Sequence, residues 1–313
     1  MPENNSSQLL HLIGLVIGAS LMLLAMNSHA DNTNLSQKFA QLRTALQDNV
    51  YGIPLYIESS AENHMMQGEV YGILRHDFSH LRQALTTAAN WCDIAPLHLN
   101  IKACTYQKLN SHCQLTFYSG RKFYENPEDV YQLAYRFDVL KSEPSYFQTR
   151  LASKTGPMGT SDYRIEAEAI PIDATSSFIH FSYAYHYNFF TKLGMNTYLA
   201  TLGRNKVGFT ILNHDPEGKP VYVQGIRGII ERNAVRYFFA IQSYLDSQAT
   251  EIDKRLEARL NDWFNLTERY PLQLHEMDRE SYLADKQKER QDQSALQQAL
   301  FATKGQAATC ATN

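Results

Sequence analysis

Alternation of apolar and polar residues dominates the middle of the chain and predicts a long antiparallel sheet. Every second residue from Tyr131 to Val139 is apolar, whereas Gln132, Arg136 and Asp138 lie between them. Successive side chains of a strand point to opposite faces, so this pattern is typical of a sheet with one buried and one solvated face. Strands are expected over residues 53–60, 65–76, 97–104, 113–123, 130–140, 146–154, 162–171 and 177–188.

Apolar residues spaced three or four apart predict helices around these strands, over residues 33–48, 77–91 and 229–247. Asp77 is a suitable N-cap for the second helix. The third carries an apolar stripe of Ile230, Ala234, Val235, Phe238, Ile241 and Leu245. A short helix over 191–203 and strands over 205–212 and 221–228 are expected between strand 177–188 and the third helix. The predicted fold class is α+β, with a curved antiparallel sheet gripping a long C-terminal helix.

The composition changes after this helix. Residues 251–292 contain 19 charged residues among 42. We expect a helical extension over 249–300, which packs through Leu256, Leu260, Trp263 and Phe264, and a disordered tail over 301–313. An alternative function follows from this extension: its charged helices would recruit a partner to an envelope interaction protein.

The N-terminus predicts export. An apolar run from Leu12 to Met26 is followed by Ser28-His29-Ala30, a small-x-small processing site, so residues 1–30 are interpreted as a signal peptide. The protein would then be exported, and periplasmic in a bacterium. The alternative is an uncleaved membrane anchor, which would keep the protein near the membrane, since Leu9 to Met26 is long enough to span. The net charge of −3 argues against a nucleic-acid partner.

Four cysteines become informative in an exported chain. Cys104 and Cys113 flank a polar loop between two apolar runs, and a hairpin there would bring their sulfur atoms together. We therefore predict a Cys104–Cys113 disulfide, with Cys92 as the competitor for Cys104. Cys310 is expected to face solvent.

The element order resembles the START-like (SRPBCC, helix-grip) superfamily of lipid and hydrophobic-ligand carriers. The local likeness lies in HDFSHLRQALTTAANWCDI, an Asp-led helix that ends in Asn and Trp, and the helix 229–247 takes the place of the gripping helix. The segment GPMGTSDYRIEAEAIP is similar to exported bacterial proteins of this type. The resemblance covers about residues 50–247 and implies a START-like domain over 31–248, with a ligand cavity between sheet and helix. It carries over no catalytic residue.

The segment FIHFSYAYHYNFF (178–190) suggests what would line such a cavity. Rows of tyrosine are unusual in a core, because each buried hydroxyl needs a hydrogen-bond partner. The predicted cavity residues are Tyr135, Phe137, Ile179, Phe181, Tyr183, Tyr185 and Arg227, the last for an anionic headgroup. Two alternatives stay open: a tyrosine-rich core filled by the helix, and an ion-pair set that joins Arg227 to Glu231 and Arg232.

The sequence favours binding over catalysis. One enzymatic alternative remains, in which Arg164, Glu166 and His180 form an acid–base cluster, although their alternating positions also fit a simple solvated face. His76 and His80 have a metal-ligand spacing, but no metal and no cofactor are expected. The leading hypothesis is an exported, non-enzymatic carrier of a hydrophobic or amphipathic, lipid-like small molecule.

Overall fold

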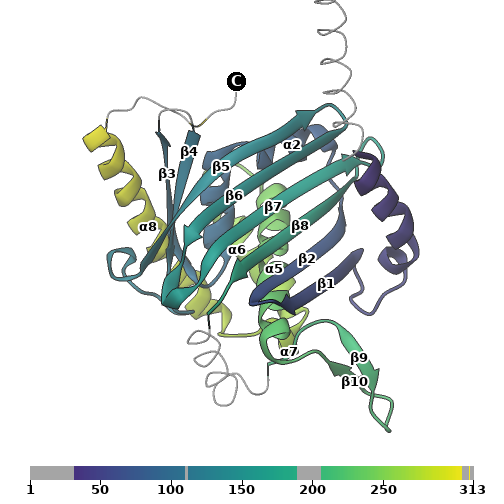
Figure 1. Ribbon diagram of the computed structural model, residues 1–313. Coiled ribbons are helices and arrows are strands. Elements are labelled where there is room, and N and C mark those ends of the chain that lie inside the picture. Colours follow the sequence, from purple (N-terminus) through teal and green to yellow (C-terminus); the bar gives the residue numbers. More distant parts are fainter. Residues whose placement is uncertain (1–31, 110–111, 189–205, 305–309, 311–313) are drawn as a thin grey trace, which may run out of the picture.

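An eight-stranded antiparallel sheet forms the centre of the protein (Figure 1). The structure, a computed structural model, describes residues 32–109, 112–188, 206–304 and 310. The strands lie in the order β1-β2-β8-β7-β6-β5-β4-β3. Their bounds are β1 Leu55–Glu62, β2 Met65–Leu74, β3 Ile101–Leu109, β4 His112–Ser119, β5 Tyr131–Glu143, β6 Tyr146–Thr155, β7 Ser161–Pro171 and β8 Ser177–His186.

The helices lie on both faces of the sheet. On one face, here called the inner face, lie α2 (Phe78–Leu85), α3 (Ala88–Ile94) and the long α5 (Gly225–Ser247). The helices α6 (Arg255–Glu268), α7 (Pro271–Leu274) and α8 (Arg279–Lys304) follow α5. Short 3-10 turns, η1 (Ala95–Leu97), η2 (Pro127–Asp129) and η3 (Pro157–Gly159), join the larger elements. The predicted fold class, a curved antiparallel sheet that grips a long C-terminal helix, is confirmed.

Glycines on β2 let α5 approach the sheet closely. A Cβ atom at Gly68 would lie 3.0 Å from the Ile230 carbonyl oxygen, and one at Gly72 would lie 2.4 Å from the Phe238 ring. Both residues occupy inner-face positions, and only a residue without a side chain fits there. Helix α5 therefore lies directly on β2, and the opposite half of the sheet curves away from it.

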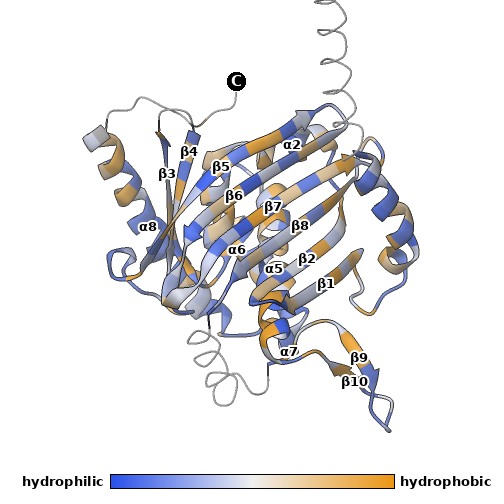
Figure 2. Cartoon of the chain, viewed as in Figure 1, coloured by the Kyte–Doolittle hydropathy of each residue, from blue (hydrophilic) through white to orange (hydrophobic). Residues whose placement is uncertain are grey.

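A second apolar cluster covers part of the outer face. The helix over residues 32–47 places Leu35, Leu42 and Leu46 against Tyr146 and Phe178 of the sheet. Burial of these side chains explains why the strand alternation is incomplete there: the outer positions of β8 and β6 are apolar beneath this helix (Figure 2).

Helix α8 covers the edge of the sheet at β3. The Gln293 side chain accepts a hydrogen bond from the Cys104 backbone N–H, and Gln297 both accepts from and donates to the Tyr106 backbone. These two amides pair with backbone groups that an edge strand otherwise leaves open to another chain. One face of the charged C-terminal extension is thus bound to the protein's own sheet.

A buried ionic cluster fixes the same helix. Glu289 binds Lys102 at 2.9 Å and Lys286 at 2.7 Å, and the three side chains are at most 3% exposed. Both ammonium groups also donate to backbone carbonyl oxygens, which provides the hydrogen bonds that a buried charge needs.

Several element boundaries differ from those expected. The predicted helix 77–91 breaks into α2 and α3, because the Thr86 and Thr87 hydroxyls bond to carbonyl oxygens one turn back. In the described residues before α5, 206–224, a small hairpin of β9 (Ile211–His214) and β10 (Pro220–Tyr222) forms, and α5 begins at Gly225 rather than 229. The predicted helix 191–203 lies outside the described residues. So do the signal peptide over 1–30 and most of the predicted tail.

The predicted Cys104–Cys113 disulfide is wrong. The structure pairs Cys92 with Cys104 and Cys113 with Cys310, so Cys310 is buried rather than solvent-facing. The strand register explains the error: across the hairpin, Cys104 lies opposite Phe117, and Cys113 lies opposite Lys108. The competitor Cys92 is Cys104's actual partner and links α3 to β3, while Cys310 links the chain after α8 to β4.

We predict that the contact between α5 and β2 is sensitive to a single methyl group. Gly72→Ala should lower the free energy of unfolding by about 1–3 kcal/mol, because its Cβ would overlap the Phe238 ring. Urea denaturation of Gly72→Ala, Phe238→Leu and the double variant measures the effect. The double variant should be more stable than the sum of the single effects implies, whereas strict additivity would contradict the close contact.

Candidate functional site

A cavity of about 180 Å³ lies between the inner face of the sheet and α5. Five tyrosines line it: Tyr135 of β5, Tyr163 of β7, Tyr183 and Tyr185 of β8, and Tyr237 of α5. We call this space the tyrosine cavity. The remaining walls are polar at His98, Asn100, Ser119 and Asn233, and apolar at Ile101, Phe117, Leu133 and Pro157.

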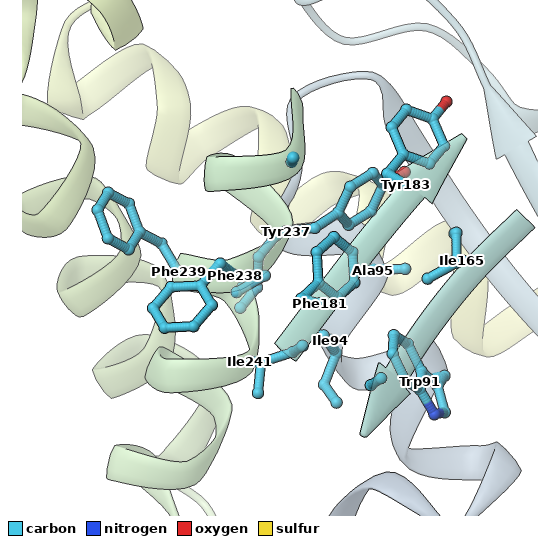
Figure 3. Close-up of a cluster of buried hydrophobic side chains, with 14 of the residues drawn as sticks. Trp91, Ile94, Ala95, Ile165, Phe181, Tyr183, Tyr237, Phe238, Phe239 and Ile241 are labelled. Atoms are coloured by element: carbon cyan, nitrogen blue, oxygen red, sulfur yellow. The ribbon is translucent and has the colours of Figure 1, made fainter. Parts of the chain in front are cut away.

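The tyrosine rings form a connected aromatic wall. Tyr163 and Tyr185 stack with their centroids 4.9 Å apart and an interplanar angle of 11°. Tyr183 lies 5.5 Å from Tyr237, which joins the sheet to the helix (Figure 3). Tyr135 lies 6.5 Å from Tyr163 in an edge-to-face arrangement. Such contacts hold the rings in place, so the cavity has a defined shape.

Most of the hydroxyl groups on this wall have no protein partner. Tyr163 donates to the Thr160 hydroxyl at 2.8 Å. Within the described part of the chain, the hydroxyls of Tyr135, Tyr183, Tyr185 and Tyr237 make no hydrogen bond to another residue. These hydroxyls belong to side chains that line the cavity, where water or a ligand can pair with them.

Burial keeps these hydroxyls protonated. It raises the pKa of Tyr163 to about 12, and raises the pKa values of Tyr135 and Tyr183 well above the usual 10. Neighbouring tyrosines add to the effect, because each would disfavour a phenolate on the next. At neutral pH the wall therefore offers neutral groups that can both donate and accept a hydrogen bond.

His98 adds a polar group at the end of the cavity. Its Nδ1 accepts a hydrogen bond from the Asn100 backbone N–H at 3.1 Å, which leaves the proton of the neutral ring on Nε2. Among the described residues, Nε2 has no hydrogen-bond partner, although His98 is only 3% exposed. Burial, then the charges of Arg236 and Lys286, lower the pKa of His98 well below 6.5. His98 is therefore a neutral donor whose Nε2–H makes no well-formed hydrogen bond to the described protein, although the nearby Asn233 side chain partly offsets the lowering of its pKa.

Three of the seven predicted cavity residues line the tyrosine cavity: Tyr135, Tyr183 and Tyr185. Phe137, Ile179 and Phe181 are buried on the same inner face but belong to the solid core, where Phe181 lies against Tyr237 (Figure 3). Their expected role in ligand binding, like that of the three tyrosines, stays a prediction.

Sequence reasoning missed several lining residues. Tyr163 lies at an inner-face position of a predicted strand, and Tyr237 lies three residues after Ala234 of the helical stripe. Both could have been found by looking for tyrosines on the predicted inner faces of the strands and of the long helix. The sequence predicts His98 and Asn100 on a regular strand over 97–104. They lie instead in the bend between η1 and β3, and no local pattern indicates that this bend reaches the cavity.

The predicted ion-pair set around Arg227 is replaced by a buried hydrogen-bond network. The Glu231 carboxylate is fully buried and accepts from the Ser59 hydroxyl, the Phe209 and Thr210 backbone N–H groups and the Thr210 hydroxyl. Arg227 donates to Ser59 at 3.1 Å and is not among the residues that line the cavity. This network holds the segment before β9 against α5.

The proposed acid–base cluster of Arg164, Glu166 and His180 does not come together. All three lie on the outer face, where Glu166 pairs with Arg150 at 2.5 Å and Arg164 is exposed. The His76 and His80 rings lie edge to face with their centroids 5.8 Å apart, and His76 also contacts the Asp246 carboxylate at 2.8 Å.

His180 belongs to a different outer-face cluster, beside the helix over residues 32–47. Its Nδ1 lies 2.7 Å from Glu168, its Nε2 lies 3.7 Å from Glu69, and its ring stacks on Tyr71 at 4.3 Å. Burial lowers its pKa, but the hydrogen bonds and charges of Glu168 and Glu69 outweigh burial and raise the pKa to about 9. His180 Nε2 makes no hydrogen bond among the described residues, but the charges of Glu168 and Glu69 hold the protonated ring in place, so we interpret this cluster as structural.

Comparisons with known proteins found distant structural similarities and no sequence relative. No protein-family model and no curated protein matches the sequence. Among solved structures, the chain is similar to a STAR-related lipid transfer protein from Xanthomonas axonopodis (10% identity, 64% of this chain and 96% of that one, TM-score 0.39). It is also similar to a conserved protein from Geobacillus kaustophilus (10% identity, 58% and 96%, TM-score 0.34).

A third similar structure is the Zhui aromatase/cyclase from a Streptomyces species (11% identity, 66% of this chain and 95% of that one, TM-score 0.30). Among the helices that the structure describes, none has an apolar stretch long enough to cross a bilayer.

We predict a pH dependence of stability that comes from His180. Its folded pKa of about 9 lies above the unfolded value, so its stabilisation is complete below about pH 6.5 and is lost as the pH rises through 9. The loss should be about 3 kcal/mol, from 1.36 kcal/mol per pKa unit. Urea denaturation between pH 6 and 9.5 measures it.

The matched variant is His180→Gln, whose stability should change less with pH than that of the wild type. Lys286, whose burial lowers its pKa to about 8, titrates in both proteins and cancels in the difference. Parallel pH profiles for the two proteins would contradict the assignment.

Proposed function

We propose that this protein is an exported, non-enzymatic carrier that holds a small hydrophobic or amphipathic molecule in the tyrosine cavity. The single observation behind the proposal is that tyrosine hydroxyls without a hydrogen bond to another described residue line the same space as the buried, unpaired His98 Nε2–H. A protein interior normally satisfies such groups, so their convergence is typical of a binding site.

The chemistry of the lining favours binding over catalysis. The tyrosine hydroxyls keep their protons and His98 stays neutral, so the cavity offers hydrogen bonds without a charged acid or base at neutral pH. A general acid or base works best with a pKa near the operating pH, and the groups of this cavity are shifted away from it.

Export is supported by the chemistry of the cysteines. Two disulfides form, one across 12 residues and one across 197, and such bonds persist in oxidising compartments such as the periplasm. The apolar segment before residue 31 is the expected export signal, either cleaved or retained as an anchor that keeps the carrier near a membrane.

We predict that filling the cavity removes the ligand. Ser119 lines the tyrosine cavity from β4, and Ser119→Phe would place a phenyl group in about 180 Å³ of space. Native mass spectrometry of protein purified from its own host should show a bound small molecule in the wild type and none in Ser119→Phe.

The matched control is Ser142→Phe, the same substitution at an exposed position of β5, which should keep the ligand. Wild-type protein without any bound small molecule, or equal occupancy in Ser119→Phe, would count against the carrier function.

A further inference from the structure

The size and polarity of the tyrosine cavity together restrict the chemical class of its ligand. This step rests on the proposed function, because it assumes that the cavity is the binding site. A volume of about 180 Å³ is close to the roughly 150 Å³ of an apolar cavity that binds benzene, and below the roughly 300–1,000 Å³ of pockets for larger ligands. A single ring with small substituents fits, whereas a long acyl chain does not.

The walls favour a flat ring. Aromatic side chains meet the cavity from the sheet at Phe117, Tyr135, Tyr163 and Tyr183, and from α5 at Tyr237. These rings already pack in stacked and edge-to-face pairs, so a further aromatic ring can join the same arrangement. An aliphatic ligand of equal size would gain burial but not these contacts.

The polar groups require oxygen atoms on that ring. His98 can only donate through Nε2, so it needs an acceptor such as a carbonyl oxygen. The hydroxyls of Tyr135, Tyr183 and Tyr185 can donate or accept, so they suit a phenolic or carbonyl oxygen. A pure hydrocarbon would leave all these groups unpaired, and sites built to hydrogen-bond a ligand reject analogues that lack the polar group.

We infer that the ligand is a single-ring aromatic compound with two oxygen atoms: a carbonyl oxygen that accepts a hydrogen bond from the His98 Nε2–H, and a further oxygen that is hydrogen-bonded to the tyrosine hydroxyls. His98 and the tyrosines thus act as the specificity-determining residues of the carrier. The apolar part of the ligand is the ring itself, enclosed by the aromatic wall.

Isothermal titration calorimetry with three probes tests this inference: 4-hydroxyacetophenone, 4-ethylphenol, which lacks the carbonyl oxygen, and decanoate, which is an acyl chain. Ligand-free protein of the mature chain should bind 4-hydroxyacetophenone about tenfold more tightly than 4-ethylphenol, which corresponds to about 1.4 kcal/mol for one hydrogen bond. Decanoate should bind more weakly than either.

Substitutions test which residue makes each proposed hydrogen bond to the probes. His98→Phe should abolish the preference for 4-hydroxyacetophenone over 4-ethylphenol. His98→Phe also removes the hydrogen bond from the Asn100 backbone N–H, so a second variant is needed. Tyr183→Phe is suitable, because the Tyr183 hydroxyl that it removes has no partner in the described protein. It should weaken binding of both phenolic probes severalfold and leave the stability of the ligand-free protein nearly unchanged, because the hydroxyl makes no hydrogen bond to the described protein. Tyr118→Phe, on the opposite face of the sheet, is the matched control.

The outcomes separate the ligand class from the carrier function. If decanoate binds more tightly than the aromatic probes, and Ser119→Phe abolishes that binding, the protein is a carrier but the inferred class is wrong. Equal affinity for 4-hydroxyacetophenone and 4-ethylphenol in the wild type would overturn the role of His98. If none of the probes binds and no molecule co-purifies, both the class and the carrier function fall.

Discussion

The contact between α5 and β2 is the constraint on which the rest of the structure depends. Gly68 and Gly72 bring the helix onto β2, close enough that a single Cβ atom would touch it. The sheet is curved, so a helix pressed against one half of it must diverge from the other half. Aromatic side chains fill most of the space between the sheet and α5. Phe181 lies in the solid core, whereas Tyr135, Tyr163 and Tyr185 line the cavity. The tyrosine cavity is thus a consequence of where the helix is allowed to sit.

Some polar residues around this space stabilise the fold, whereas others are available to bind a ligand. On the outer face and beneath α8, polar groups are paired with one another: His180 with two glutamates, Glu289 with two lysines, and the Gln293 amide with the backbone of the edge strand. In the tyrosine cavity, by contrast, hydroxyls and the His98 Nε2–H remain without partners in the described protein. Polar groups that line a cavity without protein partners are typical of a site whose partner is a ligand.

Much of the architecture could be predicted from the sequence because local patterns decide it. The alternation in β5 and β8 identifies both the sheet and its inner face, and the stripe from Ile230 to Leu245 identifies the gripping helix. The cavity itself could not be placed, because its position depends on which inner-face rings lie opposite the diverging part of α5; Tyr183 lines it, whereas Phe181, two residues earlier, does not. The disulfide pairing was missed for a similar reason. It depends on hairpin register and on the return of Cys310 to β4, two non-local features without a local signal.

The central claim is that a space lined by unpaired tyrosine hydroxyls lies between the sheet and α5 and is filled by a molecule that pairs with them. A crystal structure of the protein purified from its own host, at a resolution that shows ordered solvent, tests this claim most directly. The account predicts electron density inside the cavity, with oxygen atoms about 3 Å from His98 Nε2 and from at least one of the hydroxyls of Tyr135, Tyr183 and Tyr185. Rings packed together with their hydroxyls bonded to one another, and no density between them, would contradict it.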